Sequence, residues 1–283
     1  MGLVRQDGAA LARAMDAHAV TVMQATPATW RMLLLSGWTG SPGLKALCGG
    51  DALDPDLARR LVGATGSLWN MYGPTETTIW STCGRIADPG APIHVGRPIR
   101  RTTIRLIGDD GAPVRPGELG ELYIGGAGLA LGYTDVARTR ERFVPDPLAP
   151  ETGERFYRTG DLALLRPDGT LVMAGRTDDQ VKVRGHRIEL QDVQGALAGV
   201  RGIDHAAVVC RRDAIGENEL AAYVVPKTGA ELDASTIRER LASVLPAYML
   251  PATVTIVRAL PLTPQRQGRS SGSRRDRPAI GHR

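Results

Sequence analysis

Three short segments hold the residues whose types and spacing could do chemistry. The first, residues 70–76 (NMYGPTE), follows a strand-like run and turns sharply at its Gly-Pro pair. The hydroxyl and backbone amide of Thr75 suit a phosphate, the carboxylate of Glu76 suits Mg²⁺, and the ring of Tyr72 suits a purine. Taken alone, the segment is equally compatible with an ordinary proline turn beside a solvated glutamate.

The other two segments lie further along the chain. Residues 157–162 (YRTGDL) carry Asp161 just before an expected strand, where an acid can accept hydrogen bonds from two ribose hydroxyls. Residues 175–190 (GRTDDQVKVRGHRIEL) hold four cations, Arg176, Lys182, Arg184 and Arg187. Charges this dense on a strand usually mark a solvated edge, but beside a phosphate they form a clamp.

Other kinds of site find no support in the sequence. The glycines at 125, 126 and 128 lack the spacing of a dinucleotide-binding turn, and no P-loop motif occurs. The three cysteines, Cys48, Cys83 and Cys210, are far apart, so we expect neither disulfides nor a zinc site.

Composition excludes further classes. The 283 residues are 42% hydrophobic and 23% charged, which is typical of a globular protein. Residues 265–283 alone account for the net charge of +5, and aromatics are only 4%, so we expect no nucleic-acid partner. No apolar run is long enough to cross a membrane, and the polar N-terminus is unlike a signal peptide. The default location is the cytoplasm.

Hydrophobic periodicity and turn residues predict the elements that must position these segments. Helices are expected at residues 9–18, 27–35, 54–62, 189–197 and 235–245. Strands are expected at residues 20–24, 44–48, 68–71, 103–107, 121–124, 162–165, 170–173, 181–184, 206–211, 220–225 and 254–257. The fold class is therefore α/β plus α+β: a parallel α/β layer to about residue 90, a small β-rich subdomain at 91–175, a compact α+β module at 176–264, and a basic tail at 265–283.

The three segments, together with GELYIGGAGLALGY at 120–133 and LPAYMLP at 245–251, occur in the order found in one family. The chain resembles the adenylation domains of nonribosomal peptide synthetases, members of the acyl-adenylate-forming, AMP-binding superfamily. These five motifs span almost the whole chain. The resemblance implies that residues 1–175 are the C-terminal part of the large adenylation core and that 176–264 are its mobile C-terminal subdomain.

The resemblance also implies roles for single residues. Thr75 contacts the phosphates, Glu76 ligates Mg²⁺, and Thr75, Glu76 and Lys182 carry the catalysis. The nucleotide is bound by residues from five parts of the chain: Gly50, Asp51, Ala52, Asn70, Met71, Tyr72, Gly73, Thr75, Asp161, Met173 and Arg176. Met173 occupies a position where the family often has an aromatic residue. Asp178 is the hinge of the module, and Lys182, Gly185 and Arg187 form the face that meets the thiol-bearing arm.

The implied reaction is that of a ligase in secondary-metabolite biosynthesis. An amino-acid carboxylate attacks ATP in the presence of Mg²⁺, and the amino acid then passes to phosphopantetheine on a carrier-protein domain. The implied side-chain pocket consists of Ala25, Leu47, Gly49, Met71, Ile79 and Trp80. A tryptophan and the absence of charge favour a small uncharged amino acid, glycine or alanine.

Two expectations concern what the family has and this sequence lacks. A phosphate loop and an aspartate that holds the substrate amine precede residue 1 in the family, so we expect a missing N-terminal half and an impaired or inactive fragment. Downstream, the family has Asn-Gly-Lys-Val-Asp-Arg-Arg where this chain has residues 265–271 (QRQGRSS). Deleting one nucleotide from a possible coding sequence restores that motif, so we interpret 265–283 as out-of-frame. The alternatives are an acyl-CoA synthetase-like ligase fragment and a non-catalytic remnant or interaction module.

Overall fold

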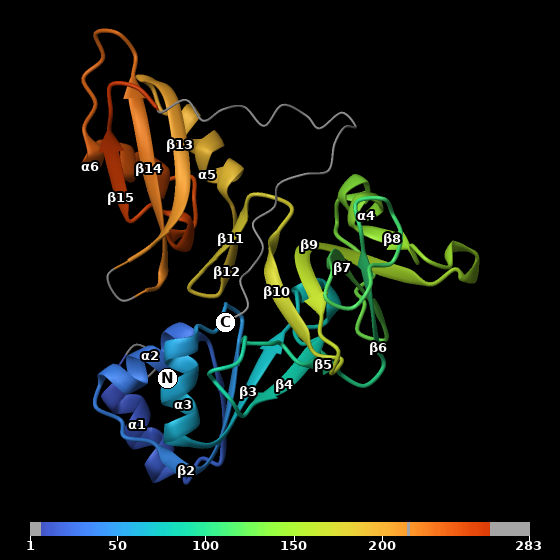
Figure 1. The fold of residues 1–283 in the computed structure, drawn as a ribbon. Coiled ribbons are helices and arrows are strands. Elements are labelled where there is room, and N and C mark those ends of the chain that lie inside the picture. Colours follow the sequence, from blue (N-terminus) through green and yellow to red (C-terminus); the bar gives the residue numbers. More distant parts are fainter. Residues whose placement is uncertain (1–6, 214–215, 261–283) are drawn as a thin grey trace.

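The computed structural model describes residues 7–213 and 216–260. Three hydrophobic clusters organise these residues: one spans Leu11 to Ile93, one spans Tyr72 to Met173, and one spans Val181 to Val254. Figure 1 shows the corresponding parts in sequence colours, with the hairpin β11–β12 lying between the first and the third. The expected tail at 265–283 lies outside the described residues.

The first part is a five-stranded sheet in the order β1-β2-β3-β4-β5. Its strands are β1 (Val22–Ala25), β2 (Ser41–Gly49), β3 (Thr65–Tyr72), β4 (Thr82–Ile86) and β5 (Arg97–Pro98). The first three are parallel, whereas β4 and β5 are antiparallel to their neighbours. The predicted parallel strands are therefore found as β1, β2 and β3, whereas the antiparallel strands β4 and β5 at the other edge were not predicted.

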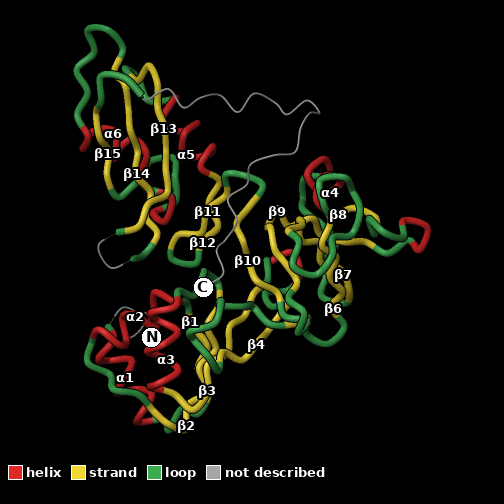
Figure 2. The backbone as a smooth tube through the Cα atoms, in the orientation of Figure 1, coloured by secondary structure: helices red, strands yellow, loops and turns green. Residues whose placement is uncertain are grey.

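Three helices cover one face of this sheet: α1 (Gly8–Ala17), α2 (Pro27–Leu35) and α3 (Pro55–Ala64) (Figure 2). The side chains of Asp7, Thr26 and Asp54 accept hydrogen bonds from backbone amides in the first turns and so fix where the helices begin. Alternate residues of β2 separate the two faces of the sheet. Leu44, Ala46 and Cys48 are fully buried toward the helices, whereas Leu47 points to the other face and is half-buried.

The second part is an antiparallel sheet in the order β10-β9-β7-β6, with β8 beside β9. The elements are β6 (Thr102–Ile107), β7 (Leu119–Gly126), α4 (Val136–Arg142), β8 (Phe143–Pro145), β9 (Arg155–Leu165) and β10 (Leu171–Arg176). Because Asp161 lies inside the long strand β9, the expectation that it precedes a strand is wrong. A positive φ of 75° at Gly160 turns the chain within this strand.

The third part begins with the hairpin β11 (Gln180–Val183) and β12 (His186–Glu189). It continues through α5 (Leu190–Ala198), β13 (Ile203–Arg212), β14 (Asn218–Pro226), α6 (Ala234–Ala242) and β15 (Thr253–Ile256). The strands β13 and β14 are antiparallel, and β15 is parallel to β14. Helix α6 ends three residues earlier than expected, since Pro246 disfavours helical backbone at the residue before it.

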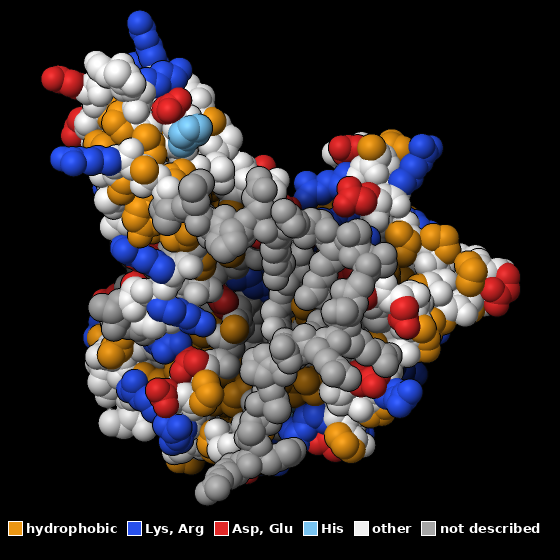
Figure 3. Space-filling model, turned by 45° about the horizontal axis from the view of Figure 1, so that its top comes forward, with side chains coloured by type: hydrophobic (Ala, Val, Ile, Leu, Met, Phe, Trp, Pro, Cys, Tyr) orange, Lys and Arg blue, Asp and Glu red, His pale blue; other side chains and the backbone are white. Residues whose placement is uncertain are grey.

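The predicted class, α/β plus α+β, is confirmed. None of the helices in the described ranges is long and apolar enough to cross a membrane. Basic and acidic side chains of the described residues are interspersed on the face drawn in Figure 3. The three cysteines are free thiols.

Candidate functional site

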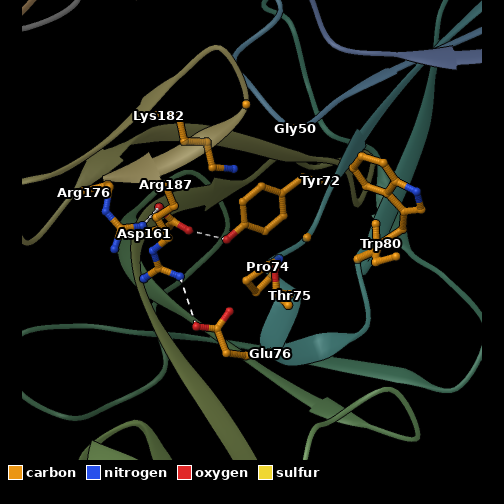
Figure 4. Close-up of a pocket in the computed structure, with 13 residues that line it drawn as sticks. Gly50, Tyr72, Pro74, Thr75, Glu76, Trp80, Asp161, Arg176, Lys182 and Arg187 are labelled. Carbon is orange, nitrogen blue, oxygen red and sulfur yellow. Dashed lines mark hydrogen bonds and ion pairs between the residues drawn. The ribbon is translucent and has the colours of Figure 1, made fainter. Parts of the chain in front are cut away.

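A cavity of about 210 Å³ lies where the three parts meet. Its walls come from the end of β2, the end of β3 with the turn after it, β9, β10 and the hairpin β11–β12. The lining residues are Gly50, Tyr72, Gly73, Pro74, Thr75, Glu76, Ile79, Trp80, Asp161, Arg176, Lys182, Gly185 and Arg187. All of them except Pro74 were predicted as site residues, and segments up to 137 residues apart in sequence meet in this one cavity (Figure 4).

The turn after β3 is a 3₁₀ helix at Thr75–Thr77, followed by Thr78 and Ile79 with φ of 61° and 69°. Left-handed backbone is unfavourable for these β-branched residues and persists only where the surroundings hold it. The hydroxyl of Thr78 donates to the carbonyl of Gly128 at 2.7 Å, and the amide of Ser81 donates to the carbonyl of Tyr72 at 2.8 Å. These bonds turn Thr75, Glu76 and Ile79 into the cavity.

Glu76 is held by groups from two other parts of the chain. Its Oε1 accepts hydrogen bonds from the hydroxyls of Tyr133 (2.5 Å) and Tyr157 (2.9 Å), and Nη1 of Arg187 lies 3.4 Å away. Burial alone would raise the pKa of Glu76, but the hydrogen bond from Tyr133 and the charge of Arg187 hold that pKa below its ordinary value. Glu76 is therefore a carboxylate in the neutral pH range, which suits a hard cation.

A second cluster of charge forms around Arg176. Its guanidinium binds Asp161, donates to Asp178 from both Nε (2.6 Å) and Nη2 (2.9 Å), and donates to the side chain of Gln180 at 2.7 Å. The hydroxyl of Tyr72 donates to the other carboxylate oxygen of Asp161. The predicted ribose ligand, Asp161, is thus joined through Arg176 to the predicted hinge, Asp178. Asp178 itself does not line the cavity.

The hairpin β11–β12 brings its cations into the cavity from the third part. Nζ of Lys182 lies 5.6 Å from the centre of the Tyr72 ring, a cation–π contact. Burial lowers the pKa of Lys182 from its ordinary value of 10.5, and the charges of Asp161 and Asp51 oppose this shift only in part. The side chain of Asn218 in β14 donates to the carbonyl of Lys182 at 2.7 Å, so the hairpin is bonded to the module that follows it.

The tip of the hairpin contacts the first sheet through Gly185. This residue has a φ of 83°, and a Cβ added to it would lie 3.2 Å from the methyl group of Thr26. Gly50, which follows β2, has a φ of 91° and would place its Cβ 3.5 Å from the same methyl group. Two glycines therefore allow the module to approach closely at this point.

Several predicted residues lie near the cavity without lining it. Ala25, Leu47, Gly49 and Met71 end the parallel strands beside it, and the ring of Trp80 covers Gly49 so closely that a Cβ there would lie 2.5 Å from Cη2. Of the six predicted pocket residues only Ile79 and Trp80 are in the lining. For the other four, a role in the amino-acid pocket stays a prediction.

The same holds for part of the predicted nucleotide site. Asp51 and Ala52 follow Gly50 outside the lining, and Met173 packs in the core of the second part. The buried amide of Asn70 donates to the carbonyl of His94 at 2.9 Å. In this structure Asn70 therefore braces β3 from within, and its predicted contact with a base stays a prediction.

Three contributors to the site were missed from the sequence: Tyr133, Tyr157 and Gln180. Tyr133 and Tyr157 stand in motifs that were quoted for the resemblance, but nothing in their local pattern indicates a bond to Glu76, 57 and 81 residues away. The side chain of Gln180 accepts from both Arg176 and Arg187. In the sequence, Gln180 lies between Arg176 and Lys182, and this position among the clustered cations could have indicated that it belongs to the site.

Comparisons with known proteins fit this geometry. Residues 1–134 match the AMP-binding enzyme family, and residues 192–266 match the AMP-binding enzyme C-terminal domain. The chain is 44% identical over 260 residues to a dimodular nonribosomal peptide synthase of Bacillus subtilis (strain 168), covering 90% of this chain and 11% of that protein. It is 40% identical over 249 residues to tyrocidine synthase 3 of Brevibacillus parabrevis, covering 86% of this chain and 4% of that protein.

Solved structures agree. A four-domain nonribosomal peptide synthetase bound to AMP and glycine, AB3403, is 44% identical with a TM-score of 0.59, covering 92% of this chain and 20% of that one. A nonribosomal peptide synthetase protein with adenylation and PCP domains, PA1221, is 31% identical with a TM-score of 0.77, covering 90% of this chain and 52% of that one. The chain thus spans 11% or less of these curated relatives and about half of PA1221. The chain belongs to the AMP-binding enzyme family, among the adenylation domains of nonribosomal peptide synthetases.

Proposed function

We propose that this chain forms part of a ligase that activates an amino acid with ATP and passes it to a phosphopantetheine thiol on a carrier protein. The observation that carries the proposal is the convergence in one cavity of Glu76, Asp161 and the cations Arg176, Lys182 and Arg187. Two carboxylates suit a cation and a ribose, and the cations suit a triphosphate. The cytoplasm, which supplies ATP, is the proposed location.

In the first step an oxygen of the amino-acid carboxylate attacks the α-phosphorus of ATP. The new P–O bond forms as the bond to the β-phosphate breaks, and pyrophosphate leaves with the electron pair. The protein contributes position and charge: Tyr72 lies against the base, Asp161 holds the ribose, and Thr75 and Arg176 contact the phosphates. The ionised carboxylate of Glu76 suits Mg²⁺, which would neutralise phosphate charge when bound.

In the second step the thiol of phosphopantetheine attacks the carbonyl carbon of the aminoacyl adenylate. A C–S bond forms, the C–O bond to AMP breaks, AMP leaves, and the thiol proton passes to solvent. The docked hairpin supports an orientation suited to this step, because Lys182, Gly185 and Arg187 face the cavity together. Rotation about Asp178 would exchange this face for another, as in other lid-type enzymes.

For the amino acid we propose a small uncharged side chain, glycine first. Trp80 and Ile79, the two residues of the predicted side-chain pocket that line the cavity, are both uncharged. The structure of AB3403, 44% identical to this chain, was solved with AMP and glycine. Two further proposed partners are a carrier domain, which PA1221 contains as a PCP domain, and the N-terminal half of the adenylation domain.

Calorimetric titration of the whole chain with AMP tests the nucleotide site. We expect binding that Asp161→Asn abolishes and that Asp109→Asn, an exposed aspartate in a turn, leaves unchanged. Equal binding by both variants, or none by the parent chain, would favour a non-catalytic module instead.

Pyrophosphate exchange tests the chemistry, with and without added N-terminal half. Glycine and alanine should support exchange, while leucine and lysine should not. A panel of acids without an amine, supplied with CoA, covers the acyl-CoA synthetase alternative, and exchange with those acids alone would replace the proposal by it.

A further inference from the structure

The two carboxylate oxygens of Glu76 differ in their hydrogen bonds: Oε1 has partners within the described ranges, and Oε2 has none there. Oε1 accepts both tyrosine hydroxyls and lies near Arg187, whereas no hydrogen bond within the described ranges involves Oε2. In Figure 4 the second oxygen points toward Thr75 and the interior of the cavity. An acceptor oxygen with two good donors has little capacity left, so a ligand approaching Glu76 from the cavity meets Oε2.

The two tyrosines are themselves rigidly held. Tyr157 in β9 is fully buried, and its hydroxyl lies 3.3 Å from that of Tyr133. The ring of Phe143 packs against both tyrosine rings, with its centroid 5.5 Å from that of Tyr133 and 5.2 Å from that of Tyr157. The guanidinium of Arg138 covers the outer side of the Tyr133 ring at 4.9 Å. Both hydroxyls are therefore fixed in position before any ligand arrives.

The backbone of Glu76 is fixed by the same region of the chain. Its carbonyl accepts a hydrogen bond from the amide of Ala130 at 2.9 Å, three residues before Tyr133. Thr78, two residues after Glu76, is bonded to Gly128. The loop between β7 and α4 thus holds both the backbone and the side chain of Glu76, although neither Tyr133 nor Tyr157 lines the cavity.

We infer that Tyr133 and Tyr157 are positioning residues for Glu76: by occupying Oε1 they fix the carboxylate so that Oε2 faces the divalent cation that accompanies ATP. The inference rests on the proposed function, because it assumes that Glu76 serves the cation. Ligating carboxylates that keep such partners bind metal more tightly, and losing a partner typically costs about 10- to 100-fold in affinity.

The test measures binding of the Mn²⁺–ATP complex to the full chain, from the enhancement of water-proton relaxation over that of Mn²⁺–ATP without protein. Tyr133→Phe removes one hydroxyl and keeps the ring. Tyr123→Phe is the matched control, since Tyr123 lies in β7 outside the cavity and makes no hydrogen bond from its hydroxyl among the described residues. Glu76→Gln removes the charge of the ligand, and AMP binding without metal reports whether the nucleotide site is intact.

We expect Tyr133→Phe and Tyr157→Phe each to weaken Mn²⁺ binding by about 10-fold or more. For both variants, AMP binding without metal should stay close to that of the parent. The melting temperature of Tyr133→Phe should also stay close to that of the parent. Adding Tyr133→Phe to Glu76→Gln should cause no further loss, because the tyrosine acts through Glu76. Equal losses of AMP and Mn²⁺ binding would mean a purely structural role and overturn the inference.

The remaining outcomes separate the inference from the proposed function. If Glu76→Gln loses Mn²⁺ and the tyrosine variants do not, the inference fails and Glu76 keeps its proposed role. If Glu76→Gln binds Mn²⁺ as the parent does, or the parent binds none, the proposed metal role of Glu76 fails and takes the inference with it.

Discussion

Arg31 in α2 and Glu217, which precedes β14, form an ion pair with 2.5 Å between Nε and Oε1. Both side chains are largely buried, with exposed fractions of 16% and 11%. The other side of the Arg31 guanidinium binds Asp54, the residue that caps α3. One guanidinium therefore joins the C-terminal module to two helices of the first part, through residues that do not line the cavity.

The first prediction concerns this ion pair. Arg31→Ala leaves Glu217 buried without its partner, so we expect a loss of about 1–3 kcal/mol of stability and a looser module. Urea unfolding followed by circular dichroism measures the first, and small-angle scattering measures the second. The matched control is Arg59→Ala, whose pair with Asp56 is solvent-exposed and should contribute about 0–1 kcal/mol. Comparable losses in the two variants would contradict the role assigned to Arg31.

The second prediction concerns close approach at the hairpin tip. Gly185→Ala should weaken docking of the module, because the new Cβ combines left-handed strain with the contact to Thr26. Gly153→Ala imposes similar strain at a φ of 72° with nothing within 4 Å, so it isolates the cost of backbone alone, about 1–2 kcal/mol.

Thr26→Ser completes that experiment. It removes the opposing methyl group and keeps the hydroxyl that caps α2. Small-angle scattering should show that Gly185→Ala makes the chain less compact and that adding Thr26→Ser restores its dimensions toward those of the parent. Adding Thr26→Ser to Gly153→Ala should change nothing. No restoration would mean that the contact does not limit the approach.

The third prediction follows from the lowered pKa of Lys182. Between the folded pKa and the unfolded value near 10.5, the unfolded chain binds more protons, so the free energy of unfolding should rise with pH in this window. Lys182→Met, which has no charge to bury, should be more stable than the parent at neutral pH and should lack this rise.

The titration can also be observed directly. The chain has three lysines, Lys45, Lys182 and Lys227, so reductive methylation with ¹³C gives three lysine resonances beside that of the N-terminal amine, and Lys182→Met assigns the one of interest. Its midpoint should lie below 10.5. A midpoint at or above that value would show that the nearby carboxylates outweigh burial.

The fourth prediction concerns the hydroxyl of Tyr72. Tyr72→Phe leaves the buried carboxylate of Asp161 with Arg176 but without its second donor. We expect about 1–3 kcal/mol lower stability, from the loss of a hydrogen bond to a charged group, and weaker AMP binding. Denaturant unfolding and calorimetry measure the two effects. Unchanged values in both would show that the hydrogen bond contributes nothing.

Local signals explain why much of this fold was predictable. Asp54 before Pro55 and Thr26 before Pro27 mark helix starts that the structure reproduces, and the apolar runs at 20–24, 44–48 and 68–71 predicted β1, β2 and β3. The antiparallel strands β4 and β5 were missed because their pairing depends on a distant contact. A Cβ on Gly84 would lie 2.4 Å from Cα of Gly96, so two glycines bring these strands together without any periodic pattern.

The site divides in the same way. Residues of the turn after β3 and of the hairpin β11–β12 were identifiable, since each motif carries several polar groups in a few positions. The tyrosines that hold Glu76 were not, because one comes from a loop and one from the interior of β9. Only the tertiary packing of the second part against the first brings their hydroxyls to one oxygen.

The guanidinium of Arg176 is shared between Asp161 and Asp178. A nucleotide that hydrogen-bonds to Asp161 and a rotation that moves Asp178 would therefore both change the ion pairs that Arg176 makes. Thermodynamic linkage makes such an effect reciprocal. If nucleotide binding changes the equilibrium constant between two orientations of the module by some factor, the nucleotide affinities of those two orientations differ by the same factor.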